Sequence, residues 1–238
     1  MARYAIGDVH GCLQTLEALL EQLGVGQGDT LIFLGDYIDR GPDSKGVIDL
    51  LMRLPQQGIA CICLKGNHEA LMIDACRKPR LDTLNRWVRN GGLQTLQSFG
   101  LDPSRLTEVP EHYLAWMEQL PVIYHSENYV CVHAGLDLTA EDPLAPDESA
   151  MLWIRNWLDE AAMERRFPGL RVLHGHTPQQ RWVLERSWEN KRPALDLDTG
   201  CVYADRDDAM GWLSAYDLDG DQLMFARYQE KTHSPGSL

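Results

Sequence analysis

Residues 4–11 read YAIGDVHG, and residues 30–41 read TLIFLGDYIDRG. In each stretch a short apolar run ends at a glycine that is followed by polar residues. Leucines at helical spacing lie between the two stretches, within residues 13–23, and a second helical pattern at 45–54 leads to a third apolar run at 59–64. This order of strand, helix, strand, helix and strand predicts neighbouring parallel strands joined by right-handed crossovers.

The remainder of the chain divides into a helical part and a β-rich part. Residues 69–120 are mainly polar with helical spacing, which predicts a helical insertion, and a further helix is predicted near 148–158. Residues 230–238 are polar and are expected to fray as a flexible tail. The length of 238 residues allows one large core, so a single domain is predicted over 1–238. Strands are predicted at 122–124 and 129–132, and near Val172, Val183, Leu195, Leu213 and Met224.

The composition argues against several classes of partner. Acidic residues outnumber basic residues by 35 to 22, and the formal charge of −13 would repel a long nucleic acid. No apolar window approaches the roughly 20 residues of a membrane span, so no membrane partner is expected. The six cysteines form no C-x-x-C pair, and the N-terminus leads directly into a strand pattern. These features predict reduced cysteines and a cytoplasmic protein.

Three of the predicted strands end in polar residues beside glycine, in the sequences GDVHG, GDYIDRG and GNHE. Ligands bind at the carboxyl ends of strands in an open parallel sheet, so these clusters should meet in space. Asp8 and His10 are two residues apart and would face the same way in an extended segment. Asp36 has two carboxylate oxygens and can be shared by two cations. Asp8, His10 and Asp36 are therefore predicted metal ligands.

The second metal is expected to use ligands from later strands. Asn67 offers an amide oxygen, whereas His68 would point the other way in an extended chain and is predicted to face the substrate. His133 and His176 follow apolar runs and have small neighbours, so they are predicted to complete the site. His174 lies on the same extended face as His176 and is the weaker alternative. Asp198 lies in the sequence DTG, which we interpret as a turn.

Carboxylate, imidazole and amide ligands without thiolates favour manganese, iron or zinc over magnesium. Two divalent metal ions about 3.5 to 4 Å apart would promote displacement at phosphorus. The guanidinium of Arg40 suits two phosphate oxygens, and Arg155 is a second candidate for binding phosphate. The prediction is hydrolysis of phosphate esters, with manganese as the first choice of metal.

The motifs GDVHG, GDYIDRG, GNHE, HAG and GHT occur in this order between residues 7 and 177. Together they resemble the metal-dependent phosphoprotein phosphatases of the calcineurin-like metallophosphoesterase type, and most of all the compact bacterial and bacteriophage lambda members. The resemblance implies an α/β fold with a central β-sandwich of mixed sheets flanked by helices in four layers. It further implies that His68, oriented by Asp39, acts as a general acid, and that a hydroxide bridging the two metals attacks phosphorus.

The substrate implied by the resemblance is phosphoserine or phosphothreonine in a protein or peptide, with phosphotyrosine as a further candidate. No regulatory subunit is inferred, because the chain lacks a segment like the C-terminal loop of eukaryotic relatives. Symmetrical hydrolysis of dinucleoside tetraphosphates is the alternative, since enzymes with that activity share the GDVHG and GNH elements and residues 197–201, LDTGC, are similar to a segment in both groups. The complete GDYIDRG and the glutamate of GNHE favour the protein phosphatases. A silent scaffold that only binds phosphoproteins is a further alternative.

Overall fold

Two mixed β-sheets form the centre of the computed structural model, which describes residues 1–230. The first sheet has the strand order β3-β2-β1-β8-β9, with β1, β2 and β3 parallel and β8 and β9 antiparallel to their neighbours. The second has the order β4-β5-β6-β7, in which only β4 runs antiparallel to its neighbour. The strands of the first sheet are β1 Arg3–Ile6, β2 Thr30–Phe33, β3 Ala60–Cys63, β8 Trp212–Asp217 and β9 Gln222–Arg227. Those of the second are β4 Ile123–His125, β5 Tyr129–Val132, β6 Arg171–His174 and β7 Ala194–Asp196.

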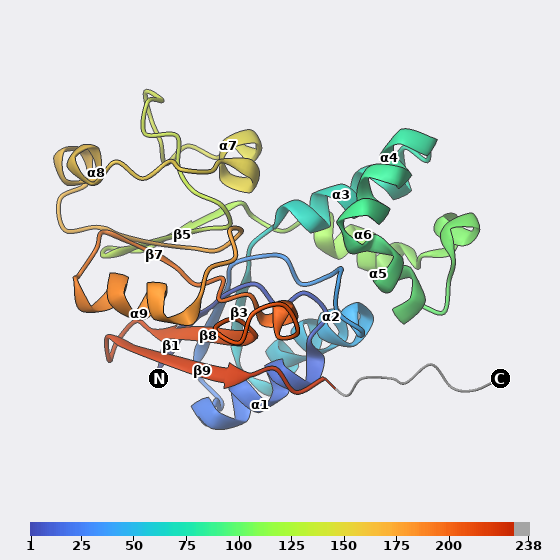
Figure 1. Cartoon of the computed structure of the whole chain (residues 1–238), viewed down its shortest axis with the longest axis horizontal. Helices are drawn as coiled ribbons and strands as arrows, with labels where there is room; N and C mark the ends of the chain where they lie inside the picture. The colour runs from blue at the N-terminus through green and yellow to red at the C-terminus, as the bar shows by residue number, and fades with distance from the viewer. Residues whose placement is uncertain (231–238) are drawn as a thin grey trace.

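The two sheets face each other across a buried apolar layer (Figure 1). Ile32 and Tyr216 of the first sheet belong to the same buried cluster as Cys131, Leu173 and Leu195 of the second. Side chains on alternate positions of a strand point to opposite faces, so one face of each sheet supplies this layer and the other face is left for helices. The predicted β-sandwich of mixed sheets is confirmed.

Helices cover the outer faces. Leu16 of α1 and Ile48 of α2 are buried with Leu31 of the first sheet, whereas Met151 of α7 is buried with Val172 of the second. The resulting order of helix, sheet, sheet and helix is the four-layer arrangement expected from the sequence (Figure 1). The helices concerned are α1 Leu13–Leu23, α2 Ser44–Arg53, α7 Glu148–Trp153 and α8 Glu160–Arg166, and short 3₁₀ turns occupy Leu54–Gln57 (η1) and Cys201–Tyr203 (η4).

The connection between β3 and β4 is helical, as predicted, and lies to one side of the sheets (Figure 1). Its first helix begins at Asn67, and a π-helical turn separates α4 from α5. That the whole chain forms a single domain with this segment as an insertion remains a prediction. The elements are α3 Asn67–Arg77, α4 Leu81–Trp87, η2 Val88–Gly92, α5 Leu93–Ser98, η3 Pro103–Glu108 and α6 Glu111–Glu118.

Two local predictions differ from the structure. The segment around Val183 is the helix α9, Arg181–Glu189, and not a strand. Its inner side chain Leu184 is buried, and Arg181 pairs with Glu185 at 2.8 Å across one helical turn. At the C-terminal end, Glu230 is buried and accepts a hydrogen bond from the backbone of Thr15 at 2.9 Å, so the chain is still packed at that residue. The rest of the predicted flexible tail, 231–238, lies outside the described residues.

Within the part of the chain that the structure describes, no helix is long and apolar enough to cross a membrane.

Candidate metal centre

The six predicted metal ligands lie together where strands of both sheets end. Each comes from a loop, or the first helical turn, that follows one of the strands β1, β2, β3, β5 and β6. All six are nearly inaccessible to solvent, with at most 7% of their surface exposed. They are Asp8, His10, Asp36, Asn67, His133 and His176.

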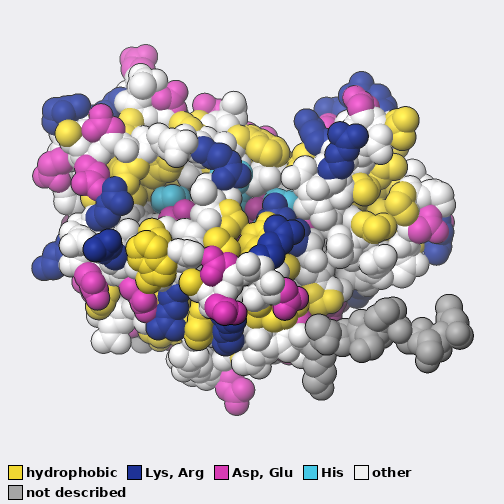
Figure 2. Space-filling model, viewed as in Figure 1, with side chains coloured by type: hydrophobic (Ala, Val, Ile, Leu, Met, Phe, Trp, Pro, Cys, Tyr) yellow, Lys and Arg dark blue, Asp and Glu magenta, His cyan; other side chains and the backbone are white. Residues whose placement is uncertain are grey.

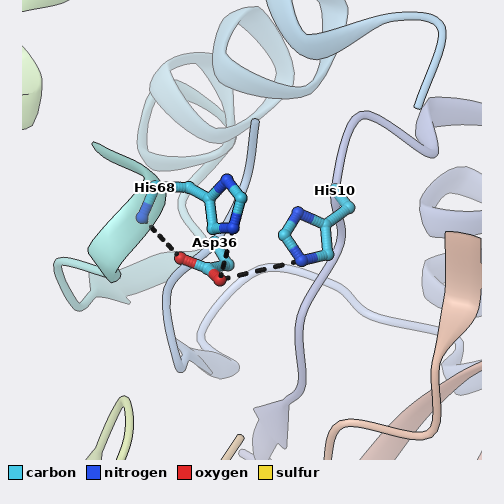
Figure 3. A group of neighbouring side chains, drawn as sticks. All are labelled: His10, Asp36 and His68. Carbon is cyan, nitrogen blue, oxygen red and sulfur yellow. Dashed lines mark hydrogen bonds and ion pairs between the residues drawn. The ribbon is translucent and has the colours of Figure 1, made fainter. Parts of the chain in front are cut away.

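Asp36 lies between two groups of side chains. Its Oδ1 is 3.5 Å from Nε2 of His133, and its Oδ2 is 3.7 Å from Nε2 of His10 and 3.8 Å from Nε2 of His68. Figure 3 shows His10 and His68 on the same side of this carboxylate. The ligand atoms of His10, Asp36 and His68 all lie within 4.8 Å of one another, and those of Asp36, His133 and His176 do so too. Asp36 therefore has the position needed to bridge two cations.

Backbone carbonyls orient two of the imidazoles. Nδ1 of His10 is 2.8 Å from the carbonyl of Ile38, and Nδ1 of His133 is 3.0 Å from the carbonyl of Leu34. A carbonyl can only accept, so each Nδ1 carries the proton and each Nε2 keeps its lone pair. Both Nε2 atoms face Asp36, which is the arrangement found around metals bound by histidine.

Asn67 and His176 complete the other side of the cluster. The amide oxygen of Asn67 is 3.0 Å from Nε2 of His133 and 2.8 Å from Nδ1 of His176. Nε2 of His176 is buried and has no hydrogen-bond partner within residues 1–230. His174 faces elsewhere, since its ring packs on Trp157 with centroids 5.4 Å apart. The geometry thus places His176, rather than His174, in the cluster.

Asp8 lies beneath these ligands and accepts from the backbone N–H of His176 at 3.2 Å. Burial, with the nearby charges of Asp198 and Asp36, raises the pKa of Asp8 well above its usual value. Asp198 is also buried, its Oδ2 has no partner within residues 1–230, and burial raises the pKa of Asp198 to about 7. Sequence reasoning missed the burial of Asp198, because a DTG turn accounts for the residue and its Oδ1 does accept from the backbone N–H of Gly200 at 3.0 Å.

The electrostatics of the cluster fit divalent cations. Burial, and then the charge of His133, lowers the pKa of His176 to about 3, and burial with the charge of Arg40 lowers the pKa of His10. These imidazoles are therefore neutral, while several carboxylates are crowded together out of water. Bound cations would offset this negative charge and would use the unpartnered Nε2 of His176. The donor set contains no thiolate.

The backbone of the site is locally strained. Left-handed φ angles between 46° and 74° occur at five of the non-glycine residues that surround the cluster, namely His10, Asp36, Asp39, Arg40 and His176. Such angles disfavour residues with a Cβ and persist only where the surroundings enforce them, most often at functional sites. The loops are also tightly apposed, because a Cβ on Gly66 would lie 2.2 Å from Oδ1 of Asp36.

His68 and Asp39 form a buried pair beside the cluster. Nδ1 of His68 is 2.6 Å from Oδ2 of Asp39, and the indole N–H of Trp87 donates to both oxygens of that carboxylate at 3.0 Å. Burial alone would lower the pKa of His68, but the charges of Asp36 and Asp39 raise it. The imidazole is thus suited to keep a proton and to release it from Nε2.

Arg40 and Arg155 line one small cavity of about 230 Å³ together with His68, Asn90 and Trp153. The guanidinium of Arg40 contacts Nε2 of His10, and that of Arg155 donates to the hydroxyl of Thr177 at 2.9 Å. Arg155 lies in the loop after α7, since this helix ends at Trp153 and does not continue to residue 158 as predicted. Both arginines can reach an anion held above the cluster.

Glu69 is a second residue whose part in the site was missed. Its carboxylate is fully buried and accepts from the backbone N–H groups of Asp36 at 3.0 Å, Tyr37 at 2.9 Å and Gly66 at 2.9 Å. It therefore joins the loop that follows β2 to the loop that follows β3. In the sequence, Glu69 stands out only as the last residue of the motif GNHE.

Comparison with known proteins shows relatives over almost the whole chain. An enzyme of Oceanobacillus iheyensis named bis(5'-nucleosyl)-tetraphosphatase PrpE [asymmetrical] is 27% identical, with 84% of each chain covered. One of Pseudomonas entomophila named bis(5'-nucleosyl)-tetraphosphatase, symmetrical, is 25% identical over all of this chain and 98% of its own. A crystal structure described provisionally as a diadenosine tetraphosphatase is 25% identical, with a TM-score of 0.68 over 97% of this chain and 95% of its own.

These relatives correct the substrate predicted from the sequence. The serine/threonine protein phosphatase assignment, with a phosphoprotein or phosphopeptide as partner, is wrong, because relatives that match 84% and 100% of this chain are named for dinucleoside tetraphosphates. The complete GDYIDRG and the glutamate of GNHE, which favoured the protein phosphatases, therefore do not separate the two substrates. The family itself is confirmed, and with it a hydrolase that uses divalent metal ions. The calcineurin-like phosphoesterase profile matches residues 1–223, and the chain belongs to this family.

Proposed function

We propose that this chain hydrolyses dinucleoside tetraphosphates at a phosphoanhydride bond. The observation that carries the proposal is the pair of relatives with this activity in their names, which cover 84% to 100% of the chain. The cluster around Asp36 supports it, because neutral imidazoles and crowded carboxylates suit cations that bind a polyphosphate. The alternative raised by the sequence thus becomes the main hypothesis.

Two divalent cations are part of the proposal, with manganese as the first choice and iron or zinc as alternatives. One cation would be held by Asp8, His10 and Asp36. Asp36 would also bind the second cation. The remaining ligands of the second cation would be Asn67, His133 and His176. When bound, the cations would neutralise charge on the phosphoryl group and make water more acidic.

The side chains around the cavity have separate tasks in this proposal. Arg40 and Arg155 would bind the oxygens of the phosphoryl group that is transferred, since guanidinium groups form paired hydrogen bonds with phosphate. Asp39 accepts a hydrogen bond from Nδ1–H of His68 and so fixes the tautomer and orientation of the ring. Nε2 of His68 would then donate a proton to the oxygen of the departing group.

The chemistry of the leaving group suits this substrate. In a dinucleoside tetraphosphate the departing oxygen belongs to a phosphate, whose last proton has a pKa of about 6, far below that of an alcohol. Proton donation by His68 is therefore needed less than in the hydrolysis of an alkyl phosphate. The enzyme depends mainly on binding and charge neutralisation of the polyphosphate.

Two coarser features of the chain accompany this proposal. A cytoplasmic location is supported by the six cysteines, because none of them forms a disulfide. Cys61, Cys63 and Cys131 lie on strands of the two sheets. A single domain is supported by the fact that ligands of the cluster come from both sheets. Limited proteolysis that released a stably folded piece would contradict the second point.

Incubation of the manganese-loaded protein with diadenosine tetraphosphate, followed by chromatography of the nucleotides, tests the function. Two molecules of ADP would indicate symmetrical cleavage, and ATP with AMP would indicate asymmetrical cleavage. The Asp36→Asn variant is the control for a contaminating activity. Absence of turnover with manganese, iron and zinc alike would overturn the proposal.

A further inference from the structure

A second cavity adjoins the metal centre and is lined by arginines. It has a volume of about 370 Å³, within the range of about 300 to 1,000 Å³ that is usual for small-ligand pockets. Arg40 and Asn90 line both this cavity and the smaller one at the metal cluster, so the two cavities are neighbours. The other side chains on its wall include Arg89, Tyr203 and Arg206.

The arginines of this second cavity have no acidic partners. Among residues 1–230, no carboxylate oxygen lies within 4.0 Å of a side-chain nitrogen of Arg40, Arg89 or Arg206. About half of the arginines of this acidic chain are paired with carboxylates, for example Arg86 with Asp74 at 2.7 Å and Arg105 with Glu108 at 2.6 Å. Three guanidinium groups without a carboxylate partner therefore line one pocket of a protein whose net charge is −13, and of these Arg40 also contacts Nε2 of His10.

The fold holds these like charges close to one another. Cζ of Arg206 lies 4.5 Å from the centroid of the Tyr203 ring, and Cζ of Arg40 lies 5.7 Å from the same centroid. On the opposite wall, the backbone N–H of Arg40 donates to the carbonyl of Gly91 at 3.1 Å, which ties the π-helical turn of Arg89 to this loop. A Cβ on Gly91 would lie 2.7 Å from the backbone nitrogen of Arg40, so the approach requires glycine there.

An anion between these groups would offset their mutual repulsion. Figure 2 shows histidine side chains on the floor of a hollow between the sheets and the helical segment, with Lys and Arg side chains around it. A substrate phosphorus above Asp36 would leave the next phosphates of the chain beside Arg40, in the direction of Arg89 and Arg206. Arginine is suited to this ligand because its donors match phosphate oxygens in pairs.

We propose that Arg89 and Arg206 bind the phosphates of the substrate that lie beyond the one attacked, and that this pocket selects polyphosphates over simple phosphate monoesters. The inference rests on the proposed function and adds to it the residues that determine specificity. Tyr203 is a positioning residue, because its ring supports the guanidinium of Arg206.

The deciding experiment is calorimetric binding of an ATP analogue with methylene bridges to the manganese-loaded protein. Arg89→Ala and Arg206→Ala should each raise the Kd of this analogue about tenfold or more, because each removes a charge-assisted contact. The Kd of inorganic phosphate at the metal centre should stay within about twofold, because a single phosphate bound there does not span the distance to Arg89 and Arg206. Arg86→Ala is the matched control, since Arg86 is a nearby arginine that pairs with Asp74.

The outcomes are distinct. Unchanged binding of the analogue in both variants, or an equal loss in Arg86→Ala, would overturn the inference. Both substituted side chains are exposed, so unfolding is not expected and thermal melting would detect it. A wild-type protein that bound the analogue through this pocket and yet left diadenosine tetraphosphate intact would contradict the proposed function and support the pocket. If the wild type is active, KM for diadenosine tetraphosphate should rise in the variants while turnover of p-nitrophenyl phosphate stays unchanged.

Discussion

Nδ1 of His68 lies 2.6 Å from Oδ2 of Asp39, and both side chains are almost completely buried. Trp87 and the hydroxyl of Thr95 also donate to this carboxylate, the latter at 2.6 Å. Asp39 is thus held in place by three donors, and its orientation does not depend on His68 alone. The arrangement fixes which nitrogen of His68 faces the cavity above the metal cluster.

Replacement of His68 by Asn should affect substrates according to their leaving groups. We expect turnover of an alkyl phosphate to fall by roughly 10² to 10⁴, the usual contribution of a general acid. The loss with diadenosine tetraphosphate should be at least tenfold smaller, because the departing phosphate needs little protonation. Steady-state rates on both substrates measure this difference.

Metal content is the control for that variant, since His68 lies near Asp36. Elemental analysis should give the same amount of manganese as in the wild type. Equal losses on both substrates would show that His68 does not act as a proton donor, and loss of metal would assign it to the cation site.

Replacement of Asp36 by Asn should weaken both cations together. The substitution removes one of the two oxygens that lie within 3.5 to 3.8 Å of the surrounding imidazoles. Outer partners of metal ligands alone contribute 10- to 100-fold in affinity, so a shared ligand should contribute at least that much. Titration of the metal-free protein with manganese measures it, with Asp82→Asn at an exposed position of α4 as the control. Loss of only one cation would contradict the bridging position.

Cation binding should release protons at pH 6. Burial raises the pKa of Asp198 to about 7, so this carboxyl holds a proton at pH 6 in the metal-free protein, and burial shifts the pKa of Asp8 in the same direction. The pKa of His176 is about 3, so this imidazole is already neutral at pH 6 and does not contribute to the proton release. Affinity should therefore increase with pH up to about 7, by roughly tenfold per pH unit for each proton released.

Calorimetry in buffers with different ionisation enthalpies counts the protons released. The Asp198→Asn variant should release fewer protons at pH 6 than the wild type. An affinity for manganese that is independent of pH between 5.5 and 7 would contradict the assignment of these carboxyls.

The order of strands and helices up to β3 could be predicted from the sequence, because each element has its own periodic pattern. The convergence of the six polar residues could also be predicted, since each follows a strand. The backbone conformation predicted for two of the site residues was wrong. β1 ends at Ile6 and His10 has a φ of 46°, so a left-handed turn, rather than an extended segment, brings His10 beside Asp36. His68 lies in the first turn of α3 rather than on a strand.

Other features depend on contacts between distant segments and leave no local pattern. The segment near Val183, predicted as a strand, is a helix whose Leu184 is buried against the sandwich. The apolar residues of this short segment fit a strand as well as a helix, so the sequence pattern alone did not decide between them. The second cavity brings Arg89 beside Tyr203 and Arg206 from more than a hundred residues away. Neither arginine lies in a recognisable motif, so the polyphosphate pocket required the structure.

Replacement of Glu69 by Gln should destabilise the fold as well as the site. Three backbone N–H groups point at the carboxylate of Glu69, and an amide would present its NH₂ group to at least one of them. Burial raises the pKa of Glu69 to about 8, so the cost comes mainly from the buried N–H that is left without an acceptor, about 1 to 3 kcal/mol, and we expect a loss of that size. Urea unfolding of the metal-free protein measures this loss, with Glu17→Gln on the exposed face of α1 as the control. A change below about 0.5 kcal/mol would show that the loops after β2 and β3 hold their positions without Glu69, and the metal affinity of the variant should then equal that of the wild type.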